Sequence, residues 1–222
     1  MDTEHFIRSL AEDLEPVRPL RPPWRRTIAW AVLAVAYLAI LIVTMSPRAD
    51  LGARMQDPRF LIEQAAALLT GLTAAIAAFA TVVPGYSRLV LLLPLVPLSV
   101  WVGAVASGAI EEYALAGAGV LGSSLDWSCV GAIIGGSAVP GVAMALMLRR
   151  GAPVTPHISA AFGALAAAGL GNLGVCLFHP HSSNLILLFW HCGTVLVLVA
   201  LAGIAGAQLL RWPSHPRALF SP

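Results

Sequence analysis

The sequence predicts an all-α integral membrane protein, a bundle of six transmembrane helices with its N- and C-termini in the cytoplasm. Composition gives the first indication: 58% of the 222 residues are hydrophobic and 11% are charged, whereas a soluble domain carries about 25% charged residues. The mean hydropathy is +0.82. The apolar residues also fall into long continuous runs, and the charges lie between these runs. We therefore expect lipid to surround most of the chain.

The six apolar runs are long enough to cross a bilayer, because a helix needs about 20 apolar residues to span a hydrocarbon core of about 30 Å. Helices are preferred to β-strands because the runs lack the alternation of barrel strands, and a helix satisfies its own backbone polar groups in lipid. We expect a cytoplasmic segment 1–26, a transmembrane domain 27–210 and a cytoplasmic tail 211–222. The predicted spans are residues 27–45, 61–83, 88–108, 128–148, 157–178 and 185–209.

Two spans have a clear starting signal in the pairs Asp57-Pro58 and Thr155-Pro156. A capping side chain followed by proline at the first helical position is typical of a helix N-terminus. Other prolines fall inside the predicted spans, where neighbouring groups must take up the freed carbonyls. These are Pro94, Pro97 and Pro140.

Small residues at intervals of four predict close helix packing in the fourth and fifth spans. The two patterns are Gly131-x3-Gly135 and Gly163-x3-Ala167-x3-Gly171.

The arginines set the expected orientation. Cytoplasmic loops of membrane proteins are enriched in basic residues. With the N-terminus inside, the cytoplasmic side receives Arg8, Arg18, Arg21, Arg25, Arg26, Arg88, Arg149, Arg150, Arg211 and Arg217. The outer side receives Arg48, Arg54 and Arg59. These arginines act as topology signals, so we expect no direct contact with nucleic acid.

Residues 3–14 predict a short amphipathic helix before the first span. Its apolar stripe consists of Phe6, Ile7, Leu10 and Leu14, and its other face carries Glu4, Glu12 and Asp13. The acidic charge has the wrong sign for an anionic membrane surface, so a protein partner fits better, with a disordered tail as the alternative. The proline-rich segment that follows is expected to be an extended spacer.

Thiols and imidazoles gather in the predicted outer leaflet. Cys129 opens the fourth span, Cys176 closes the fifth, and Cys192 lies about two turns into the sixth. Nearby are Asp126, His179, His181 and His191. This combination is typical of metal or redox sites, although thiols also serve as apolar fillers in helices. A disulfide between Cys129 and Cys176, or a soft ion bound to the reduced pair, remain alternatives.

Several segments together resemble the NrsF family (negative regulator of sigma F) of bacterial membrane anti-sigma factors. They are DTEHFIRSLAEDLEPVRPLRPP at the start, DPRFLIEQAAALLTGLTAAIAAFA in the second span, LRRGAP after the fourth, and the FHPH and WH elements near the sixth. The resemblance runs from Asp2 to about Trp212 with the same six-span layout.

The resemblance implies a multi-pass protein of the bacterial inner (cytoplasmic) membrane that sequesters an ECF-type sigma factor and releases it under metal or oxidative stress. By position, the sensing cysteines are Cys129 and Cys176, which are also the expected ligands of a transient heavy-metal ion; no permanent cofactor is expected. The sigma-binding residues would be Phe6, Ile7, Leu10, Glu12, Asp13 and Leu14. Cys192 is an additional thiol that the resemblance does not explain.

Two alternatives are a small six-span transporter and a membrane redox or metal-binding protein. The transporter lacks the ionisable residues that mark a path through the membrane, because the spans offer Glu63 near one end and the uncharged Gln64, Asn172 and Gln208. The redox protein would use His179, His181 and His191. The anti-sigma function implies that the chain is not an enzyme.

Overall fold

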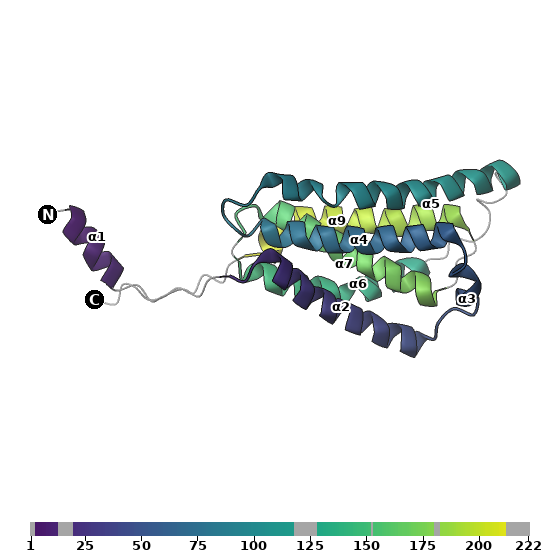
Figure 1. Ribbon diagram of the computed structural model, residues 1–222, viewed down its shortest axis with the longest axis horizontal. Helices are drawn as coiled ribbons and strands as arrows, with labels where there is room; N and C mark the ends of the chain where they lie inside the picture. The colour runs from purple at the N-terminus through teal and green to yellow at the C-terminus, as the bar shows by residue number, and fades with distance from the viewer. Residues whose placement is uncertain (1–2, 13–19, 118–127, 152, 180–182, 212–222) are drawn as a thin grey trace.

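The computed structural model describes residues 3–12, 20–117, 128–151, 153–179 and 183–211. Within these residues every regular element is helical. The elements are α1 (Thr3–Glu12), α2 (Pro23–Met45), α3 (Leu51–Arg54), α4 (Pro58–Ala80), η1 (Arg88–Leu92), α5 (Leu95–Ala116), α6 (Ser128–Arg149), α7 (Pro156–Phe178), α8 (Asn184–Ile186), η3 (Leu187–Cys192), α9 (Gly193–Ile204) and α10 (Gly206–Leu209) (Figure 1).

Six helical segments are long and apolar enough to cross a membrane, which confirms the predicted number of spans. The chain is therefore a multi-pass membrane protein. The first span begins at Pro23, because the Pro22-Pro23 pair places proline at the first helical position, where no backbone N–H is needed. The third span runs from Arg88 to Leu115 and is longer than predicted.

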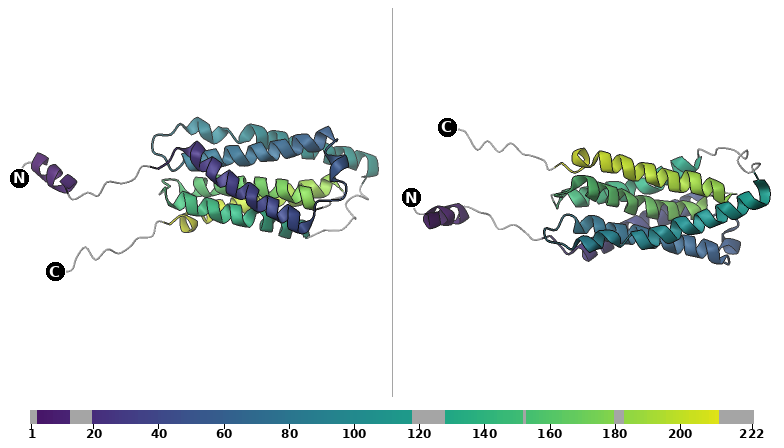
Figure 2. Two further views of the ribbon diagram at one scale, coloured as in Figure 1. Left: turned by 60° about the horizontal axis from the view of Figure 1, so that its bottom comes forward. Right: turned by 90° about the horizontal axis from the view of Figure 1, so that it is seen from above.

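Helix α7 lies at the centre of the bundle. It packs against α2, α4, α6 and α9, and Figure 2 shows these helices around it. Its residues are predominantly small, so the neighbouring backbones approach closely: a Cβ atom added at Gly171 would come within 2.9 Å of the backbone nitrogen of Ser137 on α6. Such contacts replace the hydrophobic effect as the source of helix association in lipid.

The predicted packing pattern on α7 is confirmed. Gly163 faces Met144, Ala167 contacts Gly141, and Gly171 faces Gly136 and Ser137, all on α6. The pattern on α6 itself is wrong. A Cβ atom at Gly131 or Gly135 would meet no atom within 4 Å, whereas the neighbouring Gly136 makes the close contact.

Pro94 and Pro97 lie inside the third span, as predicted, but neither interrupts a helix. Pro94 is the residue before α5 and Pro97 lies in its first turn, where no hydrogen bond is lost. Pro140 does lie inside α6. Side chains of α2 bind carbonyl groups around it: Trp30 Nε1 donates to Pro140 O (2.9 Å) and the Tyr37 hydroxyl donates to Gly135 O (2.8 Å).

Of the two predicted helix caps, one forms and the other does not. The Asp57 carboxylate accepts a hydrogen bond from the backbone N–H of Arg59 (3.0 Å), as a capping residue should. The Thr155 side chain makes no capping bond, and its carbonyl instead accepts a bond from the Ser159 hydroxyl (2.9 Å).

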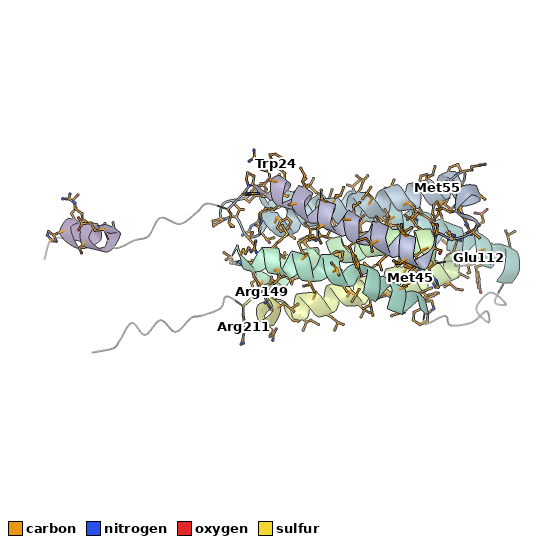
Figure 3. All side chains as sticks on the ribbon, turned by 90° about the horizontal axis from the view of Figure 1, so that it is seen from below. Trp24, Met45, Met55, Glu112, Arg149 and Arg211 are labelled. Carbon is orange, nitrogen blue, oxygen red and sulfur yellow. The ribbon has the colours of Figure 1, made fainter. Side chains whose placement is uncertain are left out.

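Charge is segregated between the two ends of the bundle (Figure 3, where Trp24, Arg149 and Arg211 label one end and Met45, Met55 and Glu112 the other). We call the first the arginine end. Among the described residues of the bundle it carries Arg21, Arg25, Arg26, Arg88, Arg149, Arg150 and Arg211 and no carboxylate. The opposite carboxylate end carries Asp50, Asp57, Glu63, Glu111 and Glu112 together with Arg48, Arg54 and Arg59. The first transmembrane helix starts at the arginine end and the last finishes there.

Candidate functional site

Cys176 lies near the end of α7, buried inside the carboxylate end of the bundle. Its Sγ is 3.9 Å from Nδ1 of His191. The Gln64 side chain of α4 lies beside the same thiol. Side chains from two other elements therefore approach this sulfur atom.

His191 reaches Cys176 from the segment η3, which is wound as a π-helix. A π-helical turn inserts an extra residue into a helix and re-aims the side chains, and such turns are frequent at functional sites. The His191 side chain is fully buried, and Nδ1 lies 2.5 Å from Oδ1 of Asn172. Because an amide oxygen accepts hydrogen bonds, we assign the proton of this contact to Nδ1.

Cys129 lies at a similar depth on α6. The antiparallel helices α6 and α7 touch at Gly136 and Gly171. Cys129 comes two turns before Gly136, about 10 Å along the axis of α6. Cys176 comes five residues after Gly171, about 8 Å along the axis of α7. Because the two helices are antiparallel, both cysteines lie in the same direction from the contact. Both residues are 1% exposed. The structure brings the two predicted sensing thiols to the same level of the bundle.

The other predicted ligands are placed less closely. Cys192 is half-buried and follows His191 in η3. His179 lies just beyond α7, where its backbone N–H bonds to Val175 O (2.8 Å). Asp126 and His181 lie outside the described residues. Across the residues the structure describes, no group of three or more His, Cys, Asp or Glu side chains is arranged to hold a metal ion. The thiol of Cys176 and the imidazole of His191 could supply two ligands.

A loop from α2 covers the end of α7 beside Cys176. The backbone N–H of Arg48 donates to Leu177 O (3.1 Å), and its guanidinium donates to Cys176 O (3.4 Å). The Arg48 side chain is 1% exposed and is paired with Asp50 at 2.5 Å. Hydrogen bonding to Arg48 lowers the pKa of the Asp50 carboxyl to about 2. The loop is therefore held by a charge pair over the whole physiological pH range.

A polar cavity of about 350 Å³ opens at the carboxylate end. Asp57, Glu63 and Glu111 line it, with the Arg59–Glu111 ion pair (2.7 Å) along its wall. Glu63 is 5% exposed. Arg54 also lines the cavity, so its wall carries both signs of charge.

Sequence reasoning did not assign Asn172, Gln64 or Arg48 to the site. Asn172 had a detectable signal, because it lies four residues before Cys176 and hence on the same face of α7. Gln64 and Arg48 had none, since their contacts with Cys176 depend on how α4 and the loop after α2 pack against α7.

The chain was then compared with known proteins. A family model described as "Negative regulator of sigma F" (NrsF) matches residues 10–212, which is most of the chain. The chain belongs to the NrsF family. No curated protein and no solved structure matches it.

Membership of the NrsF family confirms the resemblance noted in the sequence. The family description is one of negative regulation, and a sigma factor is the partner it implies. The match includes all six spans and the buried thiol–imidazole pair, and it begins within α1.

Proposed function

We propose that this NrsF-family chain is a membrane-bound anti-sigma factor of the bacterial inner membrane that holds an ECF-type sigma factor and releases it when a metal ion or oxidant reacts with Cys129 and Cys176. The observation that carries the proposal is the buried juxtaposition of Cys176 and His191, level with Cys129, at the carboxylate end. The terminal segments leave the bundle at the opposite end, so signal and partner would meet the protein on different sides of the membrane.

The arginine end supports a cytoplasmic position for both termini. Seven of its residues are arginines and the described bundle has no carboxylate there, which is the pattern expected for the cytoplasmic side. The carboxylate end, with the thiols, would then face the periplasm.

Two chemical events fit the site. A thiophilic ion would replace the thiol protons and bind the sulfur atoms, with His191 as a nitrogen ligand. Alternatively, a peroxide would accept two electrons from the thiols, which would lose two protons and form a disulfide while the peroxide is reduced to water. Neither event requires Cys192.

The reaction must change how the helices pack to reach the cytoplasm. Cys129 and Cys176 belong to α6 and α7, which touch along their length, and both helices end or begin at the arginine end. Moving such an equilibrium from 1:99 to 99:1 takes about 5.5 kcal/mol of differential binding. Metal–thiolate bonds are strong enough to supply it.

Helix α1 is the proposed sigma-binding element. It forms over Thr3–Glu12, with Ile7 exposed; Asp13 and Leu14 lie outside the described residues, and the side chains of Phe6 and Leu10 are not described. The proposed anchor is the apolar stripe with the acidic residues beside it, which would bind a groove on the sigma factor.

The test is a sigma-dependent reporter in cells that carry Cys129→Ser or Cys176→Ser, with Cys192→Ser as the matched control. We expect both sensing variants to lose induction by a heavy-metal salt or peroxide, because one thiol of the pair is missing, and the control to keep it. Parental induction in both sensing variants would overturn the sensing role.

A second measurement separates binding from sensing. A sigma factor should co-purify with the full chain from unstressed cells, and deletion of residues 1–12 should abolish this. Retention of the sigma factor after the deletion would show that α1 is not the binding element.

A further inference from the structure

A cavity of about 440 Å³ lies at the arginine end, between the start of α2 and the end of α6. Pockets of this size hold small ligands. Four of the lining side chains are arginines. The lining residues are Leu20, Arg21, Arg25, Arg26, Ala29, Met147 and Arg150.

Arg26 is the unusual member of this group, because it is 7% exposed. One terminal nitrogen, Nη2, donates to the carbonyl of Met147, and the guanidinium lies over the Phe79 ring at 4.5 Å. The other terminal nitrogen, Nη1, is buried and has no hydrogen-bond partner. A buried cation that lacks a counter-charge is costly, so this site calls for an anion.

The described part of the protein supplies no such anion. Its ion pairs are formed by Arg48, Arg54 and Arg59, all at the carboxylate end. Arg150 lines the same cavity, so a second positive charge faces Arg26 and repels it. A ligand with at least one negative charge would relieve both the repulsion and the unpaired nitrogen.

The cavity lies at the depth of lipid headgroups. Trp24, in the first turn of α2, is 54% exposed, and Arg25 stacks over it at 5.0 Å. Exposed tryptophan at a helix end is typical of the membrane–water interface. Apolar surface continues below the cavity, since Leu33 on α2 and Leu146 on α6 are both exposed. A headgroup in the cavity would leave its acyl chains along these residues.

We propose that this cavity binds the phosphate headgroup of an anionic phospholipid. The arginines would hold the phosphate oxygens by charge-assisted hydrogen bonds, and basic pockets between transmembrane helices are suited to this role. A zwitterionic lipid is disfavoured because its own cation would enter a site with four arginines. The inference does not depend on the proposed sigma-factor function.

The experiment uses the full chain, delipidated in neutral detergent, and measures lipid binding by native mass spectrometry with phosphatidylglycerol and phosphatidylcholine of equal chain length. We expect phosphatidylglycerol to bind with well over tenfold preference. Arg25→Gln and Arg150→Gln should each weaken its binding by about tenfold, the loss of one charge-assisted hydrogen bond. Arg88→Gln, at the same end but outside the cavity, is the matched control and should change binding less than twofold.

Three outcomes would overturn the proposal: equal binding of the two lipids, unchanged binding in Arg150→Gln, or an equal loss in Arg88→Gln. Two competitors test other anions. Displacement of the lipid by inorganic phosphate at matched concentration would identify a site for a free anion, and displacement by a peptide of residues 1–12 would identify the chain's own acidic segment as the occupant. Arg150→Gln changes an exposed side chain, so its fold, checked by circular dichroism, should match that of the parent.

Discussion

The Cys176 thiol is held in an environment that is rare for a lipid-embedded residue. An amide from α4, an imidazole from η3 and a guanidinium from the loop after α2 all approach Cys176. Polar groups inside a membrane are expensive and are retained where they serve a function. Burial also limits which reagents reach the sulfur.

The His191 imidazole should control the reactivity of Cys176. The thiolate is the reactive form of cysteine, and an N–H donor beside it stabilises that form. In a background with Cys129→Ser and Cys192→Ser, we expect His191→Gln to slow labelling of Cys176 by a small neutral thiol reagent about tenfold, equivalent to about 1.4 kcal/mol. The measurement is the labelling rate of purified protein followed by mass spectrometry.

The control for this prediction is His179→Gln, which changes a half-buried imidazole beyond the end of α7 and should leave the rate within twofold. An unchanged rate in His191→Gln would show that the imidazole fills space and has no influence on the thiol.

At the scale of single residues, the sequence identifies the thiols and their depth, because hydropathy places the ends of the spans. It does not identify the partner of Cys176. His191 and Cys192 are adjacent in the chain, and His191 is fully buried whereas Cys192 is half-buried. Which of the two faces Cys176 depends on the rotation of η3, which a π-helical turn changes. No local sequence pattern fixes that winding.

Among the elements, the α6–α7 contact is the most sensitive to side-chain volume. A Cβ atom at Gly171 would lie 2.3 Å from Ser137 Oγ and 2.9 Å from Ser137 N. We expect Gly171→Ala to destabilise the bundle by about 1–3 kcal/mol, because the backbone of α6 must move away. Thermal unfolding in detergent is the measurement.

Gly131→Ala is the matched control on α6, since its Cβ atom would meet nothing within 4 Å. It should be neutral or slightly stabilising, by up to about 1 kcal/mol, because alanine favours the helix more than glycine does. A loss of stability as large as that of Gly171→Ala would contradict the contact described.

Hydropathy predicts the helices themselves well, because lipid leaves the backbone few alternatives. Helix contacts are harder to predict. The small-residue pattern of α7 makes close contacts, and the structure identifies α6 as its partner, which the pattern alone does not predict. On α6 the close contact is made by Gly136, while the predicted Gly135 makes none. Only packing distinguishes the two neighbours.

For the whole molecule, the separation of charge between the ends makes a prediction about sidedness. In a cysteine-free background, Gln56→Cys probes the carboxylate end and Ser87→Cys the arginine end, and both positions are exposed. We expect a membrane-impermeant maleimide to label Gln56→Cys in cells with a permeabilised outer membrane, and to label Ser87→Cys after lysis of the inner membrane. The reverse pattern would place the thiols in the cytoplasm and contradict the proposed signalling.

The same separation of charge makes the bundle an electrical dipole along the membrane normal. With the arginine end in the cytoplasm, the interior-negative resting potential attracts these cations. Turning the molecule over would carry each of them outward against about 2.3 kcal/mol per 100 mV. An energised membrane thus locks the inserted chain in one direction, and only small internal rearrangements stay within reach of thermal energy.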